Sequence, residues 1–225
     1  MIYKLDPQLD MISSLLIQLD IKYCIDSGTL LGIIREGALL ANDLDIDISI
    51  HDTQLSKVHM LKSELRIRGY KSRILSFHGQ IYKIKFSNSQ EKRFIDINIF
   101  SKSMDNIYYV CPQPSPILNN ENFLFFYTRK IIRIIFGIIK NIGSEFDLNY
   151  FPWKLGTIHD TWVIPNDYFD NFQHLIDNIY VPNNYESYLK FRYGEWKTPK
   201  KNWNFRTDDM ALAQYPPTKY RLYKL

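Results

Sequence analysis

The feature that most constrains the fold of this chain is the stretch 44–50, in which apolar and polar side chains alternate. Its apolar positions are Leu44, Ile46, Ile48 and Ile50, and its polar positions are Asp45, Asp47 and Ser49. A period of two is that of a β-strand with one buried face. The sequence therefore predicts a half-buried strand, with Leu44 on the inward face and two carboxylates on the outward face.

Predicted helices and strands alternate around this strand in the first half of the chain. Asp6 and Pro7 are typical of a helix start, as N-cap and first helical residue. Further helices are predicted at 29–35 and 51–68, and strands at 21–26, 70–77, 80–86, 93–100 and 106–111. This order predicts an α/β (α+β) fold, with a mixed β-sheet flanked by helices.

The second half of the chain is predicted to be more helical. Its expected helices are 123–140, 167–177 and 185–193, and the segment 112–120 is the best linker candidate. The expected organisation is a catalytic core at 1–111, a helical region at 112–205 packed on that core, and a basic aromatic tail at 206–225.

Composition and charge exclude several classes of protein. With 225 residues, 45% of them hydrophobic, and only two cysteines, the chain is neither disordered nor a disulfide scaffold. The net charge is +4, and residues 196–225 alone hold seven basic and two acidic residues. A basic tail without a basic groove argues against a dedicated nucleic-acid binder. It leaves an anionic small molecule, a phospholipid or an anionic polymer as partner.

The start of the chain shows no secretory signal, which predicts a cytoplasmic protein. Segment 123–143 is the most apolar, but four basic residues interrupt it. A buried helix is the preferred interpretation, and an interfacial helix at the inner face of the membrane is the alternative.

Three carboxylates are the candidate catalytic groups. Asp45 and Asp47 share one strand face, where like charges repel and raise pKa values unless a cation lies between them. Mg²⁺ or Mn²⁺, which prefer oxygen ligands, would resolve that conflict. Asp96 lies in the largely apolar strand 93–100, where a carboxylate needs a pairing partner or a metal. The alternatives are an exposed polar strand face and an ion pair of Asp96 with a nearby lysine or arginine, such as Lys83, Lys85 or Arg93.

A turn of small residues precedes these carboxylates. Ser27, Gly28 and Thr29 open a predicted helix and would leave its N-terminal amides open to a phosphate. Arg35, one to two turns later, is a second candidate anion ligand. The alternatives are an ordinary strand-to-helix turn and a cap on a surface helix. Turn and carboxylates together follow the plan of metal-dependent phosphoryl or nucleotidyl transfer.

Three segments carry a resemblance to a known family. Residues 27–48 read SGTLLGIIREGALLANDLDIDI, residues 94–100 read FIDINIF, and residues 181–196 read VPNNYESYLKFRYGEW. They resemble the LicD/fukutin-related family. That resemblance implies a nucleotidyltransferase-like fold that uses Mg²⁺ or Mn²⁺. It also implies transfer of phosphocholine, ribitol phosphate or glycerol phosphate from a CDP-linked donor to a cell-surface glycan or lipid-linked oligosaccharide, as in capsule or lipopolysaccharide biosynthesis.

The spacing and the resemblance together suggest roles for individual residues. The catalytic and metal-binding candidates are Asp45, Asp47 and Asp96. The substrate-binding candidates are Ser27, Gly28, Thr29, Arg35, Asp43, Tyr193, Gly194 and Trp196. The last three would close the site, or else form a helix end with a buried tryptophan. The sequence departs from the family at Asn42 and Leu44, where a tryptophan and an acid are usual.

Two other functions remain open at this point. The same carboxylates would serve a nucleotidyltransferase that adds NMP to a small molecule and releases pyrophosphate. The departures at Asn42 and Leu44 also allow a catalytically idle glycan-binding protein on the same fold.

Overall fold

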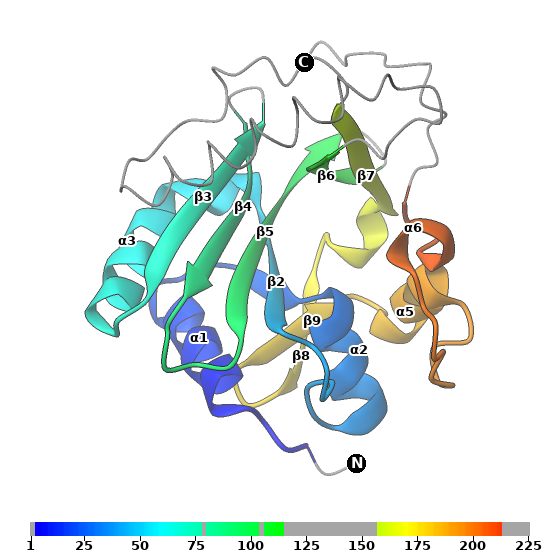
Figure 1. The fold of residues 1–225 in the computed structure, drawn as a ribbon, viewed down its shortest axis with the longest axis horizontal. Coiled ribbons are helices and arrows are strands. Elements are labelled where there is room, and N and C mark those ends of the chain that lie inside the picture. Colours follow the sequence, from blue (N-terminus) through cyan, green and yellow to red (C-terminus); the bar gives the residue numbers. More distant parts are fainter. Residues whose placement is uncertain (1–2, 78–79, 104–105, 115–156, 213–225) are drawn as a thin grey trace, which may run out of the picture.

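The computed structural model describes residues 3–77, 80–103, 106–114 and 157–212. A seven-stranded sheet is built from β1 (Tyr23–Ile25), β2 (Asp45–His51), β3 (Lys71–Phe77), β4 (Gln80–Ser87), β5 (Phe94–Ser103), β6 (Asn106–Pro114) and β7 (Thr157–Pro165). The strand order is β1-β2-β5-β4-β3, and β6 and β7 extend the sheet from β5 (Figure 1). β2 and β5 run parallel, while the other pairs are antiparallel. The predicted mixed sheet is confirmed.

Helices flank this sheet, and all but α6 overlap helices that the sequence predicted. The helices are α1 (Pro7–Gln18), α2 (Ser27–Glu36), α3 (Leu55–Ile67), α5 (Tyr185–Tyr193) and α6 (Phe205–Asp208). The Asp6 carboxylate accepts hydrogen bonds from the backbone N–H groups of Gln8 and Leu9, which confirms Asp6 as the N-cap of α1. A short 3₁₀ turn, Asp52–Gln54, precedes α3.

The apolar faces of the central strands form the core and fix the register of the sheet. Buried isoleucines occupy alternate positions of β2 and β5, namely Ile46, Ile48, Ile50, Ile95, Ile97 and Ile99, and they share one cluster with apolar side chains of α1 and α3. Burying a side chain of this size contributes roughly 1.5–3 kcal/mol. A slip of one residue would expose the whole row. The same alternation turns Asp45, Asp47 and Asp96 to the opposite face.

Leu44 does not continue the inward face, contrary to the sequence prediction. Its side chain is 59% exposed. The strand begins at Asp45, so Leu44 precedes the regular alternation. The carbonyl of Leu44 nevertheless accepts a hydrogen bond from the amide of Phe94, at 2.9 Å. The backbone of Leu44 is therefore joined to the start of β5, while its side chain is largely exposed.

The predicted helix at 167–177 is wrong. The segment forms a 3₁₀ turn, Asn166–Tyr168, and a strand, β8 (Phe172–Ile176), which pairs with β9 (Ile179–Pro182) in a hairpin. Asp177 in the turn adopts a φ of 44°, a left-handed conformation that aspartate tolerates better than most residues. Asp177 and Asn178 are thus typical of a hairpin turn. The spacing of the apolar residues in the segment also suits a helix, which explains the wrong prediction.

The described part of the C-terminal half holds strands as well as helices. The predicted helix at 185–193 is confirmed as α5. Figure 1 shows α5 and α6 beside α2, on the side of the sheet away from β3. Residues 112–114 of the expected linker belong to β6. The rest of that linker, the predicted helix 123–140 and the tail beyond residue 212 lie outside the described residues. Within the described ranges, no helix has the length and hydropathy needed to cross a bilayer.

Candidate metal and phosphate site

Three carboxylates meet on the face of the sheet opposite the isoleucine core. Asp45 and Asp47 lie two residues apart on β2, and Asp96 lies opposite Asp47 in the parallel register with β5. One carboxylate oxygen from each of the three lies within 4.8 Å of the others. Asp45 and Asp47 are half-buried, and Asp96 is buried. Adjacent strands lie about 4.8 Å apart, so the pairing of β2 with β5 brings Asp96 beside the carboxylates of β2.

This crowding changes the acidity of two side chains. Burial, followed by the charges of Asp45 and Asp96, raises the pKa of Asp47 to about 7. Burial and the neighbouring Asp45 likewise raise the pKa of Asp43 to about 7. Carboxyl groups with such values carry part of their protons at neutral pH unless a cation compensates their charge.

Two lysines of β4 pair with the third carboxylate. The Nζ of Lys83 lies 2.7 Å from Oδ2 of Asp96, and the Nζ of Lys85 lies 3.6 Å from its Oδ1. The ion pair considered as an alternative for Asp96 is therefore present, alongside its position in the cluster. Arg93, the third candidate partner, pairs instead with Asp6 at 3.0 Å.

The turn at the start of α2 is fixed to the sheet by hydrogen bonds. Asp26 is the N-cap, and its carboxylate accepts a hydrogen bond from the backbone N–H of Ser27 at 2.6 Å. The buried hydroxyl of Thr29 accepts a hydrogen bond from the backbone N–H of Asp47 at 2.8 Å. Thr29 thus links the helix to the strand that carries the carboxylates, and one of the two acceptor sites of its hydroxyl is engaged.

Gly28 allows a close approach between this turn and Asp43. A Cβ at position 28 would lie 2.2 Å from Oδ2 of Asp43. The Asp43 carboxylate therefore lies against the first turn of α2, where exposed amides favour negative charge. The protein's own carboxylate occupies part of the space predicted for a phosphate.

The remaining predicted residues lie in or beside the segment that follows α5. Arg35 donates to the carbonyl of Trp196 at 3.3 Å, so this contact is not with the carboxylates. Gly194 ends α5 with a φ of 62°, and Trp196 is buried, which matches the alternative of a helix end with a buried tryptophan. Burial is the largest cause of the raised pKa of Tyr193, and the charge of Asp47 is one of the smaller causes.

A buried ionic network behind the turn was missed in the sequence analysis. Arg192 donates to Asp26 at 3.2 Å and to the hydroxyl of Ser27 at 3.1 Å, and it also pairs with Asp209. The hydroxyl of Tyr188 donates to Asp26 at 2.8 Å. One part of this network could be predicted from the sequence: Tyr188 and Arg192 are four residues apart and so share a face of α5.

The oxygen donors fit a hard divalent cation such as Mg²⁺ or Mn²⁺. Asp45, Asp47 and Asp96 would hold it. Asn98 donates from Nδ2 to Oδ1 of Asp47 at 3.1 Å. The buried oxygens Oδ1 of Asn98 and Oδ1 of Asp96 have no hydrogen-bond partner among the described residues. Buried acceptors are normally satisfied, so a cation with its waters would complete this set.

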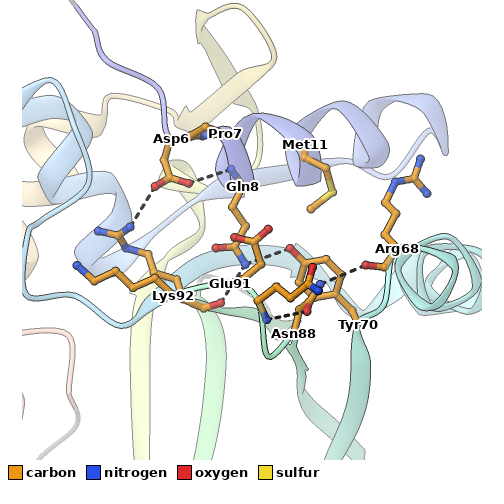
Figure 2. A pocket seen from close by; sticks show the side chains of 11 residues that line it. Asp6, Pro7, Gln8, Met11, Arg68, Tyr70, Asn88, Glu91 and Lys92 are labelled. Carbon is orange, nitrogen blue, oxygen red and sulfur yellow. Dashed lines mark hydrogen bonds and ion pairs between the residues drawn. The ribbon is translucent and has the colours of Figure 1, made fainter.

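Two surface hollows lie outside the carboxylate cluster. One, of about 360 Å³, separates the start of α1 from the β4–β5 turn, and in Figure 2 Gln8 reaches across it to Tyr70. Its lining contains none of the three clustered carboxylates. The other, of about 460 Å³, is lined by α5 and the residues after it, including Gly194 and Trp196.

Comparison with known proteins identifies the N-terminal half. Residues 20–131 match the LicD/FKTN/FKRP nucleotidyltransferase domain. An uncharacterized protein of Rickettsia typhi, RT0683, is 31% identical over 117 residues, which cover 52% of this chain and 33% of that protein. The match thus spans about a third of the relative's length. The matched domain includes the α2 turn and all three clustered carboxylates, and the chain belongs to the LicD family.

Proposed function

We propose that this chain is a metal-dependent phosphotransferase that uses a CDP-linked donor. It moves a phosphorylated small alcohol, of the phosphocholine, ribitol phosphate or glycerol phosphate type, to a hydroxyl of a cell-surface glycan. The observation that carries the proposal is the cluster of Asp45, Asp47 and Asp96 beside the α2 turn, in a chain of the LicD family. Donor and acceptor are inferred from the family resemblance.

The transfer needs one bond to form and one to break. The acceptor oxygen attacks the phosphorus that carries the alcohol, while the bond between that phosphorus and the bridging oxygen breaks. CMP leaves with the bonding electrons, and the hydroxyl proton passes to a carboxylate of the cluster and then to solvent. A bound divalent cation would offset the charge of the donor diphosphate and polarise its oxygens.

The α2 turn would act mainly by orienting carboxylates. Thr29 is bonded to the backbone of Asp47, and Gly28 makes room for the carboxylate of Asp43. We therefore expect the donor diphosphate to be held chiefly at the carboxylate cluster. In this proposal Arg35 is not a phosphate ligand, because it contacts the Trp196 carbonyl and pairs with Glu36 at 2.8 Å.

The experiment is a direct assay of CMP release. Purified protein is incubated with Mn²⁺ and CDP-choline, CDP-ribitol or CDP-glycerol, with and without a mixture of bacterial glycans. We expect CMP release that requires the metal, increases with glycan and is lost in Asp45→Asn. The matched control is Asp170→Asn, which removes a surface carboxylate paired with Lys102 and should retain activity.

The same assay separates the other candidate functions. Release of pyrophosphate from CTP or another NTP, with no CMP from CDP-alcohols, would replace the proposal with NMP transfer. Equal activity of wild type and Asp45→Asn would show that the cluster is not the catalytic centre. No turnover of any donor, together with glycan binding by folded protein, would favour an idle binding protein.

A further inference from the structure

The two lysines that face the acidic cluster raise the question of how many cations the site takes. In the antiparallel register of β4 and β5, Lys85 lies opposite Asp96, and Lys83 lies opposite Asn98. All four positions therefore share the face of the carboxylates. The shorter contact is the diagonal one, from the Nζ of Lys83 to Oδ2 of Asp96 at 2.7 Å.

Lys83 is the better-enclosed of the two ammonium groups. Its side chain is 18% exposed, against 33% for Lys85, and the carboxylate that it contacts is only 3% exposed. Lys85 divides its interactions, because its Nζ also lies 4.1 Å from the ring centre of Phe94. A charge pair that is largely shielded from water interacts more strongly than an exposed pair. Lys83 is thus the main positive charge on Asp96.

The charges around the site match a single divalent cation. Asp43, Asp45, Asp47 and Asp96 contribute four negative charges when ionised, and Lys83 and Lys85 contribute two positive charges. One divalent ion neutralises the remaining net charge of two negative charges. A second divalent ion would give the site a positive net charge before a donor phosphate binds. The second ion would also have to approach the Oδ2 that Lys83 contacts.

We propose that Lys83 takes the place of a second metal ion, so that the site binds one divalent cation per chain. This inference rests on the proposed function, because it concerns the same carboxylates. The ammonium group of Lys83 occupies Oδ2 of Asp96 and leaves Oδ1, which has no hydrogen-bond partner among the described residues, for the cation shared with Asp45 and Asp47. Asn98 holds a second carboxylate of the cluster, that of Asp47, through a hydrogen bond.

The test counts bound ions without any substrate. Mn²⁺ is titrated into the full chain at pH 7.5, with free Mn²⁺ followed by electron paramagnetic resonance and heat followed by calorimetry. The variants are Lys83→Met, which keeps the side-chain length but removes the charge, and Lys83→Arg, which keeps the charge. Lys71→Met on the exposed edge strand β3 is the matched control. Circular dichroism checks that each variant is folded.

We expect one Mn²⁺ per chain in wild type, Lys83→Arg and Lys71→Met. Lys83→Met should bind a second ion, and its first ion should bind about tenfold more tightly, because a repelling charge is gone. Two ions in the wild type, or a Lys83→Met titration identical to that of the wild type, would overturn the inference and leave the proposed function standing. No Mn²⁺ binding by folded wild type would instead contradict the metal site itself.

Discussion

Replacing Arg192 should test how far the C-terminal region stabilises the turn at the start of α2. Arg192 is 5% exposed and bridges Asp26 and Asp209, which are 6% and 5% exposed. In Arg192→Met both carboxylates stay buried without this cation. Breaking a buried ion pair by removing one partner costs about 3–5 kcal/mol. The loss is a large part of the roughly 5–15 kcal/mol that stabilises a typical domain.

Urea denaturation, followed by circular dichroism, measures this loss directly. With a denaturant slope of about 2 kcal/mol per molar, a loss of 3–5 kcal/mol lowers the midpoint by about 2 M. Arg68→Met is the matched control, because Arg68 pairs with Glu64 on the surface, where both side chains are 40% exposed. A surface pair of this kind contributes about 0–1 kcal/mol.

The double variant Arg192→Met/Asp209→Asn should recover part of the lost free energy of unfolding, since it removes one of the two buried carboxylate charges that Arg192→Met leaves without a cation. If Arg192→Met does not fold, Arg192→Lys gives the same comparison, because a single ammonium group cannot bridge both carboxylates as the guanidinium does. A loss below about 1 kcal/mol in Arg192→Met, no larger than in Arg68→Met, would refute the reasoning.

Three further predictions concern the acidic cluster. Asp45→Asn removes a charge that raises the pKa of Asp47, so calorimetry should show a metal-free Tm about 2–4 °C higher and a lost Mn²⁺ response. The folded-state pKa of Asp47, about 7, exceeds its ordinary value. Metal-free stability should therefore fall as pH rises from about 4 to 7, and the Mn²⁺-induced Tm shift should grow between about pH 6 and 8; a shrinking shift would contradict this. Gly28→Ala displaces the Asp43 carboxylate, whose Oδ2 would lie 2.2 Å from the new Cβ. Since alanine favours a helix, Tm should change little while Mn²⁺ affinity, measured by titration, falls about tenfold.

Local patterns were sufficient to predict the elements that hold the site. The alternation at 44–50 placed Asp45 and Asp47 on one face of a strand, and the helix start at Asp6 followed from capping chemistry. Asp96 stood out as a carboxylate in an apolar strand. Its parallel pairing with Asp47 was not predictable from local sequence, because strand order depends on which apolar faces pack together.

Long-range contacts account for what the sequence analysis missed. The pair of Arg192 and Asp26 joins residues 166 positions apart, and no spacing rule connects them. The hairpin at 172–182 carries apolar residues at intervals that suit a helix as well as a strand, and its partner strand decides between the two. Leu44 was expected to be buried, but the strand starts one residue later.

The most direct test of the central claim is nucleotide binding that depends on metal. CDP, UDP, ADP and GDP are titrated by calorimetry into the full chain, with and without Mn²⁺, beside the variant Asp45→Asn/Asp47→Asn. We predict that CDP binds in the presence of Mn²⁺, that the other nucleotides bind more weakly, and that the variant does not bind. At a CDP concentration of about 100 times its Kd, the folded protein should gain ~2.7 kcal/mol. Binding of CDP that is unaffected by removing the metal or by the double substitution would contradict the account.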